Sequence, residues 1–193
     1  QVPKDVSVGE AWLIADHPSC ESVVAEGPWQ GKTLHELMAI DKAAILGEFA
    51  KPTTSGRFPL MLKLIDAGDV LSVQVHPDDA QARTLNEPDG GKTEMWYILD
   101  ADSDSMLLSG LREGTTPEIL ETALHAGTAD RVMQVFSVNQ GDAVFVAAGN
   151  VHAIGAGILL AEIQQNSDIT YRLYDWNRVD RTENHENCTL KKQ

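Results

Sequence analysis

The sequence predicts a mainly β protein, built as a double-sheet jelly-roll barrel with a few short helices packed outside it. Many short segments rich in β-branched and aromatic residues lie between turns that contain glycine or proline, and several of them alternate apolar and polar residues at period two. Two segments, which begin at Thr33 and Thr116, are predicted to be helices from their capping residues. Strands this numerous and this short form a sandwich or a barrel. A chain of 193 residues is long enough for one such domain.

The predicted elements follow one another in a simple order. Residues 9–31 are interrupted by glycine and proline, which predicts short strands and turns. Thr33, with Glu36 three residues later, has the pattern of a capping box and predicts a helix that ends at Gly47. A Thr-Pro pair at 116–117 predicts a second, shorter helix. Strands are predicted at 61–65, 71–76, 94–99, 105–108, 132–138, 143–147 and 158–164.

The composition argues against several classes of partner. The net charge of −14 opposes binding to nucleic-acid phosphates and to an anionic membrane, and no run of Lys or Arg offsets it. The longest apolar stretches are far too short to span a bilayer. Cys20 and Cys188 stand far apart and outside any C-x-x-C spacing, so they predict neither a disulfide framework nor a thiolate zinc site. We therefore expect a cytoplasmic protein that binds neither nucleic acid nor membranes.

Four side chains of the kinds that bind divalent metal ions lie on or beside the predicted strands. Gln74 and His76 share one face of their strand because they are two residues apart. Glu94 begins the next strand, and His152 follows a strand that ends in a glycine turn. Two imidazoles, a carboxylate and an amide oxygen suit a borderline ion such as zinc. For a single histidine an ordinary hydrogen-bonded role is the commoner alternative, but the set of four predicts a metal site.

The spacing of these residues resembles the cupin motifs. Residues 141–152 resemble the second cupin motif, G-x5-P-x-G-x2-H, with Ala147 where that motif has proline. The first cupin motif usually has H-x-H followed closely by Glu. Here Gln74-x-His76 is separated from Glu94 by a loop, and this departure points to one particular cupin family.

That family is the type I mannose-6-phosphate isomerases, or phosphomannose isomerases, in their short bacterial form. The sequence resembles it from about Gly9 to His185. Complete members carry a preceding segment and a second, C-terminal cupin domain, neither of which is found here. We expect residues 1–193 to form a single catalytic cupin domain with helical insertions, truncated at both ends, whose exposed apolar surface favours self-association. The segments that carry the resemblance include 31–34, 57–63, 91–97, 161–168 and 170–175.

The resemblance implies an aldose–ketose isomerase that interconverts D-mannose 6-phosphate and D-fructose 6-phosphate. In this reaction a proton moves between carbons 1 and 2 through a cis-enediol. The resemblance also implies a small-molecule sugar phosphate as the partner and one Zn²⁺ per chain, held by Gln74, His76, Glu94 and His152. The reaction requires a Lewis acid, a proton-transferring base, cations for the phosphate and the exclusion of water.

Three residues are candidates for the chemical step. Lys92 lies two residues before the carboxylate ligand and faces the same side of an extended chain, although a surface lysine is the plainer alternative. Glu162 shares a strand face with apolar residues, where burial and zinc tune the pKa of an acid/base. Arg172 matches an active-site arginine of the family. Its alternative is a structural ion pair with Asp168 or Asp175.

Other residues receive weaker assignments. Ser72 and Lys63 match pocket positions of the family and are expected to help hold the phosphate. His185 matches a family histidine whose role the sequence does not indicate. The remaining three histidines are interpreted as surface or packing residues: His17, His35 and His125.

Two other functions stay open. Two histidines and a carboxylate hold iron(II) in cupin oxygenases, although Lys92 and Arg172 suit an anionic sugar phosphate better. A non-catalytic module that binds sugar phosphates is the second alternative.

Overall fold

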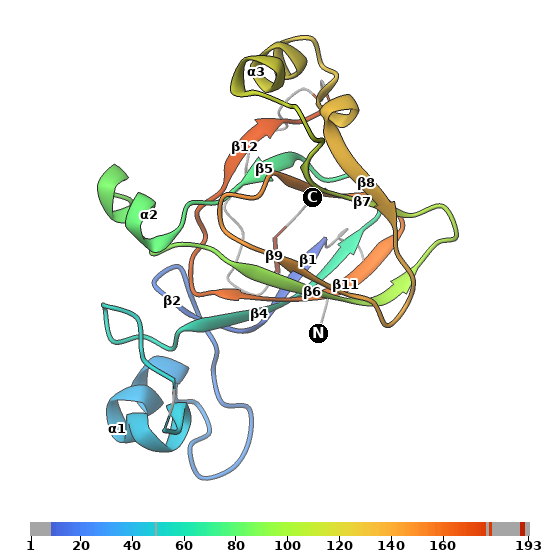
Figure 1. Ribbon diagram of the computed structural model, residues 1–193. Coiled ribbons are helices and arrows are strands. Elements are labelled where there is room, and N and C mark those ends of the chain that lie inside the picture. Colours follow the sequence, from blue (N-terminus) through green and yellow to red (C-terminus); the bar gives the residue numbers. More distant parts are fainter. Residues whose placement is uncertain (1–8, 49, 177, 179–189, 192–193) are drawn as a thin grey trace.

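Two antiparallel sheets lie face to face and form the barrel (Figure 1). The computed structural model of the protein describes residues 9–48, 50–176, 178 and 190–191. The larger sheet has six strands in the order β13-β1-β4-β11-β6-β9, and the smaller sheet has five in the order β12-β5-β10-β7-β8. The predicted mainly β fold class with short peripheral helices is therefore confirmed.

The strand bounds are as follows. The six-stranded sheet contains β1 Glu10–Ile14, β4 Leu60–Ala67, β6 Glu94–Ala101, β9 Ala143–Val146, β11 Ile158–Gln165 and β13 Leu190–Lys191. The five-stranded sheet contains β5 Val73–Val75, β7 Met106–Leu111, β8 Met133–Ser137, β10 His152–Ile154 and β12 Tyr171–Tyr174. A small separate hairpin is formed by β2 Asp16–His17 and β3 Cys20–Glu21.

The barrel interior is apolar at one end. Ile65, Ile98 and Leu160 from the six-stranded sheet pack in one cluster with Leu107 and Ile154 from the five-stranded sheet. All five side chains are buried. Alternation along each strand explains this cluster, because residues two apart point to the same face.

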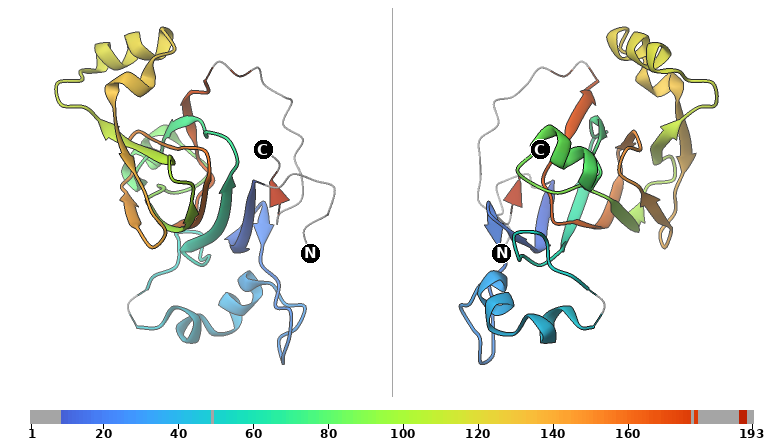
Figure 2. Two further views of the ribbon diagram at one scale, coloured as in Figure 1. Left: turned by 90° about the vertical axis from the view of Figure 1, so that its right-hand side faces the viewer. Right: turned by 60° about the vertical axis from the view of Figure 1, so that its left-hand side comes forward.

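Three helices lie at the edge of the barrel rather than inside it (Figure 2). The predicted helix at 33–47 is α1 Leu34–Leu46, with the Thr33–Glu36 capping box formed and a kink at Asp41. The predicted second helix is α3 Pro117–His125, capped by Thr116. Both predictions are confirmed.

One α-helix and three strands are missing from the sequence prediction: α2, β10, β12 and β13. Helix α2 Asp79–Leu85 begins with a capping box of Asp78 and Gln81, a signal that the sequence contains. Strand β10 has only three residues, too few for a visible alternation, and it becomes a strand because it pairs with both β5 and β7. Short elements of this kind depend on long-range pairing more than on local pattern.

Two further observations bear on the composition. Among the described residues, none of the helices is long and apolar enough to cross a membrane. Cys20 is buried. Cys188 lies outside the described residues.

Candidate metal centre and active site

Strand register places three predicted site residues in one row of the five-stranded sheet. His152 on β10 is directly opposite Gln74 on β5, and Gln74 is directly opposite Arg172 on β12. Directly opposite residues of antiparallel strands point to the same face. His152 is fully buried, Gln74 is half-buried and Arg172 is exposed. The row therefore runs from the barrel interior to its rim.

The facing sheet supplies a second set of polar side chains. Glu94 on β6 is directly opposite Gln164 on β11. Glu162, two residues earlier on β11, is directly opposite Trp96 on β6 and Lys63 on β4. All five side chains are buried. The polar end of the barrel is thus lined by both sheets.

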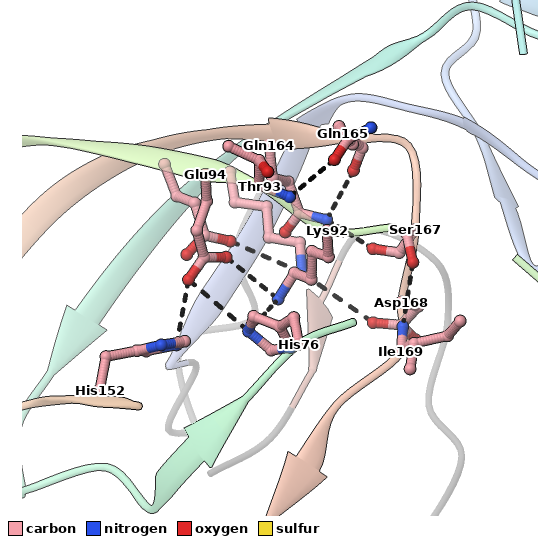
Figure 3. Close-up of polar contacts among 12 residues, drawn as sticks. His76, Lys92, Thr93, Glu94, His152, Gln164, Gln165, Ser167, Asp168 and Ile169 are labelled. Atoms are coloured by element: carbon pink, nitrogen blue, oxygen red, sulfur yellow. Dashed lines mark hydrogen bonds and ion pairs between the residues drawn. The ribbon is translucent and has the colours of Figure 1, made fainter. Parts of the chain in front are cut away.

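His76, Glu94 and His152 meet at this end, and the ligand atoms that they offer all lie within 4.8 Å of one another (Figure 3). The Nε2 atom of His152 lies 3.1 Å from Oε1 of Glu94, and the Nε2 atom of His76 lies 3.6 Å from the same oxygen. The three residues come from strand β6, strand β10 and the position directly after β5. This is the geometry of a metal-binding triad.

The hydrogen bonds around His152 test whether a metal fits. Its Nδ1 lies 2.8 Å from the carbonyl oxygen of Asn150, which can only accept, so Nδ1 carries the hydrogen. In a neutral ring the Nε2 lone pair then faces the Glu94 carboxylate. Within the described chain, His152 Nε2 and both Glu94 oxygens are buried and make ion-pair contacts but no hydrogen bond of good geometry. A lone pair and a carboxylate repel at this distance unless a cation joins them, so the donor set fits a divalent metal ion.

Lys92 is buried beside this triad. Its Nζ lies 3.2 Å from Oε2 of Glu94 and 3.3 Å from Nε2 of His76. Burial by itself would lower the pKa of Lys92, but the charges of Glu94 and Glu162 outweigh it and raise that pKa. Burial raises the pKa of Glu94, but Lys92 and the two histidines outweigh it and hold that pKa well below its usual range. Lys92 is therefore a cation and Glu94 an anion at neutral pH.

The protonation of His76 also suits a metal ligand. Burial lowers the pKa of His76, and the charge of Lys92 lowers it further, against the opposing effect of Glu94. His76 is thus neutral at pH 7. A neutral imidazole is the form that binds a metal ion.

Glu162 lies in a different electrostatic environment. Burial raises its pKa, and the nearby Glu94 charge raises it further, against the attraction of Lys92 and Lys63. The Nε1–H of Trp96 donates to Oε2 of Glu162 at 2.9 Å. Two carboxyl groups in one site therefore have pKa values displaced in opposite directions, an arrangement that is typical of acid/base centres.

Lys63 is buried among acidic groups rather than at an open mouth. Its Nζ lies 3.8 Å from Glu10 and 4.0 Å from both Glu162 and Asp168, and 4.7 Å from the centre of the Trp12 ring. Burial and the charge of Lys92 lower the pKa of Lys63, although the three carboxylates oppose this. Lys63 faces the same interior as Glu162.

Helix α2 holds the segment that carries Lys92 and Glu94. The N–H of Gly91 donates to Oδ1 of Asp79 at 2.8 Å. A Cβ atom on Gly91 would lie 2.5 Å from the backbone nitrogen of Asp79, so only glycine fits there. The Asp78–Gln81 capping signal could have revealed this support from the sequence.

The other predicted residues are placed as follows. Ser72 is half-buried just before β5. Arg172 makes no ion pair within the described chain, and Asp175 pairs with Arg178 instead. His17, interpreted as a surface or packing residue, is buried, and its Nε2 contacts the Asp89 carboxylate at 3.0 Å. His35 contacts Asp16, and His125 contacts a backbone carbonyl on α3. His185 lies outside the described residues.

Comparison with known proteins indicates the family of this chain. Residues 1–121 match the family described as phosphomannose isomerase type I, catalytic domain. The mannose-6-phosphate isomerase ManA of Bacillus subtilis is 42% identical over 184 residues, which is 95% of this chain and 56% of that protein. The crystal structure of the mannose 6-phosphate isomerase from Bacillus subtilis has a TM-score of 0.80 and 37% identity, and the match covers 95% of this chain and 55% of that one.

A more distant likeness concerns the fold alone. A mannose 6-phosphate isomerase structure bound with zinc and yttrium is 18% identical, with a TM-score of 0.57 over 86% of this chain and 61% of that one. The chain spans about half the length of the curated relatives that it matches most strongly. The family match covers most of this chain, including the Lys92–Glu94 segment. The chain belongs to the type I phosphomannose isomerase family.

Proposed function

We propose that this chain carries the catalytic centre of an isomerase that interconverts D-mannose 6-phosphate and D-fructose 6-phosphate. The observation that carries the proposal is the convergence of His76, Glu94 and His152 on one interior, beside a buried lysine and the separately tuned carboxyl of Glu162. The family match supports the choice of substrate. In this proposal residues 1–193 act as one catalytic cupin domain, and its partner is the small sugar phosphate.

We further propose that the metal ion is zinc, one per chain, held by Gln74, His76, Glu94 and His152. The distant structural relative solved with zinc supports this choice. Zinc supplies Lewis-acid stabilisation of negative charge on a substrate oxygen. Gln74 joins the set because its strand register puts it directly opposite His152 on the same face. A neutral amide leaves more positive charge on the ion than a third charged ligand would.

Glu162 is the proposed proton carrier between carbons 1 and 2. Its carboxylate takes the proton from one carbon, leaving a cis-enediolate, and returns the proton to the neighbouring carbon, while the hydroxyl proton passes from the oxygen of one of these carbons to the oxygen of the other. The pKa of Glu162 is raised towards neutral pH, and a catalytic base works best when its pKa is near the working pH. The Trp96 N–H fixes one oxygen, so the other oxygen is oriented for proton transfer.

The cations of the site complete the mechanism. The buried ammonium of Lys92 lies 3.2 Å from Glu94, one of the three residues of the metal-binding triad. From this position it stabilises negative charge on the enediol oxygens. Arg172, at the rim and without an ion pair in the described chain, is the proposed ligand for sugar oxygens or phosphate. Ser72 and Lys63 are proposed to assist phosphate binding. The buried interior excludes water from the intermediate. A cytoplasmic location follows from a metabolic substrate of this kind.

A coupled assay of mannose 6-phosphate conversion, with and without added zinc, tests the proposal. We expect zinc-dependent turnover that falls by about 10³-fold in Glu162→Gln, because general acid–base groups contribute 10²–10⁴-fold. The exposed Glu113 is the matched control, and Glu113→Gln should keep full turnover. Sugar-phosphate binding with no turnover at any zinc concentration would instead support the non-catalytic module, and oxygen uptake would support the oxygenase.

A further inference from the structure

Gln164 has no role in the mechanism above, yet it lies against the metal centre. It is directly opposite Glu94 on the neighbouring strand and therefore points to the same interior face. Its side chain is 1% exposed. Figure 3 draws it beside Glu94 and the segment that carries Lys92.

The orientation of the Gln164 amide is determined by its surroundings. The Nε2 atom donates to two backbone carbonyl oxygens, that of Ser167 at 2.5 Å and that of Gln165 at 3.0 Å. The opposite orientation would place Oε1 against these two oxygens, and none of the three could donate. Nitrogen therefore points to the turn at 165–167, and Oε1 points away from it.

Among the residues that the structure describes, Oε1 of Gln164 has no hydrogen-bond partner, although it is buried. The neighbouring Gln165, on the other face of the strand, offers a contrast. Oε1 of Gln165 accepts from the N–H of Thr93 at 2.8 Å. Asn166 also has a buried oxygen without a partner, but Asn166 is not opposite a metal-binding residue. Of these amides, Gln164 alone combines a free acceptor with a place on the site face.

A free acceptor beside a carboxylate calls for a ligand that donates. Glu94 and Gln164 are directly opposite each other, and both carry buried oxygen atoms on the same interior face. Buried acceptors are normally satisfied, and a polyol offers hydroxyl donors of the required kind. We propose that Gln164 is a substrate-binding residue whose Oε1 accepts a hydrogen bond from one hydroxyl group of the sugar phosphate. This inference rests on the proposed function and adds a determinant of specificity to it.

Binding of an unreactive ligand series to the zinc-loaded chain tests this inference. Mannitol 1-phosphate is an open-chain analogue that cannot isomerise because it has no carbonyl group. Calorimetry should compare it with its monodeoxy derivatives, each lacking one hydroxyl. We expect one derivative to bind about 10-fold more weakly than the parent, because the missing hydroxyl group leaves the buried acceptor oxygen of Gln164 unpaired. In Gln164→Met the parent should weaken by a similar factor, and the difference between the parent and that derivative should vanish.

Two further variants separate binding from folding. Gln134 on β8 is an exposed glutamine whose Nε2 donates to the Leu111 carbonyl at 2.9 Å, so Gln134→Met is the matched control and should keep the wild-type pattern. Gln164→Glu keeps an acceptor oxygen and, when its carboxyl is protonated, still donates to a carbonyl of the turn, so in that form it should still discriminate against the same derivative.

The outcomes that overturn the inference are distinct from those that overturn the function. If the wild-type chain binds the parent and all derivatives equally, Gln164 does not read a hydroxyl, whether or not the methionine variant folds. The same conclusion follows if Gln164→Met keeps the wild-type discrimination. If the wild-type chain binds no sugar phosphate at all, both the proposed function and the role of Gln164 fall.

Discussion

Strand β11 separates two surfaces of opposite character. Glu162 and Gln164 point into the barrel and are buried, whereas Leu159 and Ile163 point out of it and are 36% and 38% exposed. On neighbouring β9, Phe145 is 69% exposed. Soluble proteins usually place charged groups outside and large apolar groups inside. The six-stranded sheet reverses this arrangement at its polar end.

The reversal on the inside has a chemical explanation. Buried charges are tolerated where each has partners of opposite sign, and here two lysines lie among the carboxylates. A set of paired charges and metal-binding groups in a dry interior can act strongly on a bound substrate. The inner face of the six-stranded sheet is thus built for chemistry, at a cost in stability.

The outside needs a different explanation. Across the outer face, Phe145, Met95, Ile163 and Leu62 follow one another in register on four adjacent strands. The outer face of the five-stranded sheet is covered, because Leu120 and Leu124 of α3 pack against a buried cluster there. We define the four residues in register as the outer apolar row. This row is where the expected self-association would occur.

Removal of a metal ligand from the inner face should have the largest effect. In His152→Ala an inner-sphere bond is lost, and zinc affinity should fall by more than about 100-fold, because partners outside the ligand set alone contribute 10–100-fold. Chelator competition and metal analysis by mass spectrometry measure this, with about one zinc expected in the wild-type chain. His125 also contacts a backbone carbonyl through Nδ1, so His125→Ala is the control. Two zinc ions per wild-type chain would contradict the proposed ligand set.

A pair of leucines on β11 compares the two faces directly. Leu160 is fully buried and Leu159 is 36% exposed. Leu160→Ala should lower the free energy of unfolding by about 2–5 kcal/mol, because it leaves a cavity. Leu159→Ala should cost roughly 1 kcal/mol or less. Urea unfolding of both variants measures the difference, and equal losses would mean that the outer face is covered in solution.

Substitution of Arg172 tests the rim of the barrel, where this inner-face residue is exposed. Arg172→Lys keeps the charge but loses the planar fork, so kcat should fall by about 100-fold if the contact strengthens in the transition state. Zinc content and melting temperature should hardly change, because Arg172 makes no ion pair in the described chain. Arg131→Lys, an exposed substitution on the 3₁₀ turn Ala129–Val132, is the control. Near-normal turnover would make Arg172 a structural residue and leave Lys92 as the catalytic cation.

Trp96 tests the tuning of the inner carboxyl. Glu162 must be deprotonated to act as a base, so kcat should fall as the pH drops through its raised pKa. Trp96→Phe removes a hydrogen bond that lowers this pKa, so the acidic limb of the pH–rate profile should move to higher pH. Trp29 is half-exposed, so the same substitution at Trp29 is the control for the loss of an indole ring. A pH–rate profile that is unchanged in Trp96→Phe would mean that another group moves the proton.

The outer apolar row should give the smallest change in stability. Phe145→Ser should reduce self-association in light scattering while altering the free energy of unfolding by about 0.5 kcal/mol or less. Leu85 on α2 is exposed but lies outside the row, so Leu85→Ser should leave association unchanged. A wild-type chain that stays monomeric at high concentration would contradict the role of this row.

Much of this protein was decided locally and could be predicted from its sequence. Period-two alternation indicates that Gln74 and His76 share a face, and the capping box at Thr33 indicates where α1 begins. Such patterns depend on residues two to four apart, which remain neighbours in any fold. Alternation also makes Glu162 an acid/base candidate, whereas the family resemblance supplied the assignment of Arg172.

Tertiary structure decided the rest, because strand register depends on pairing between distant segments. Only register puts Gln164 opposite Glu94 and turns its side chain to the same interior face. Only the fold brings the Glu94 carboxylate to His76 and His152, which are far from it in the sequence. The apolar outer residues read as ordinary strand residues in the sequence. Their exposure follows from what packs against each sheet, and local pattern carries no record of that.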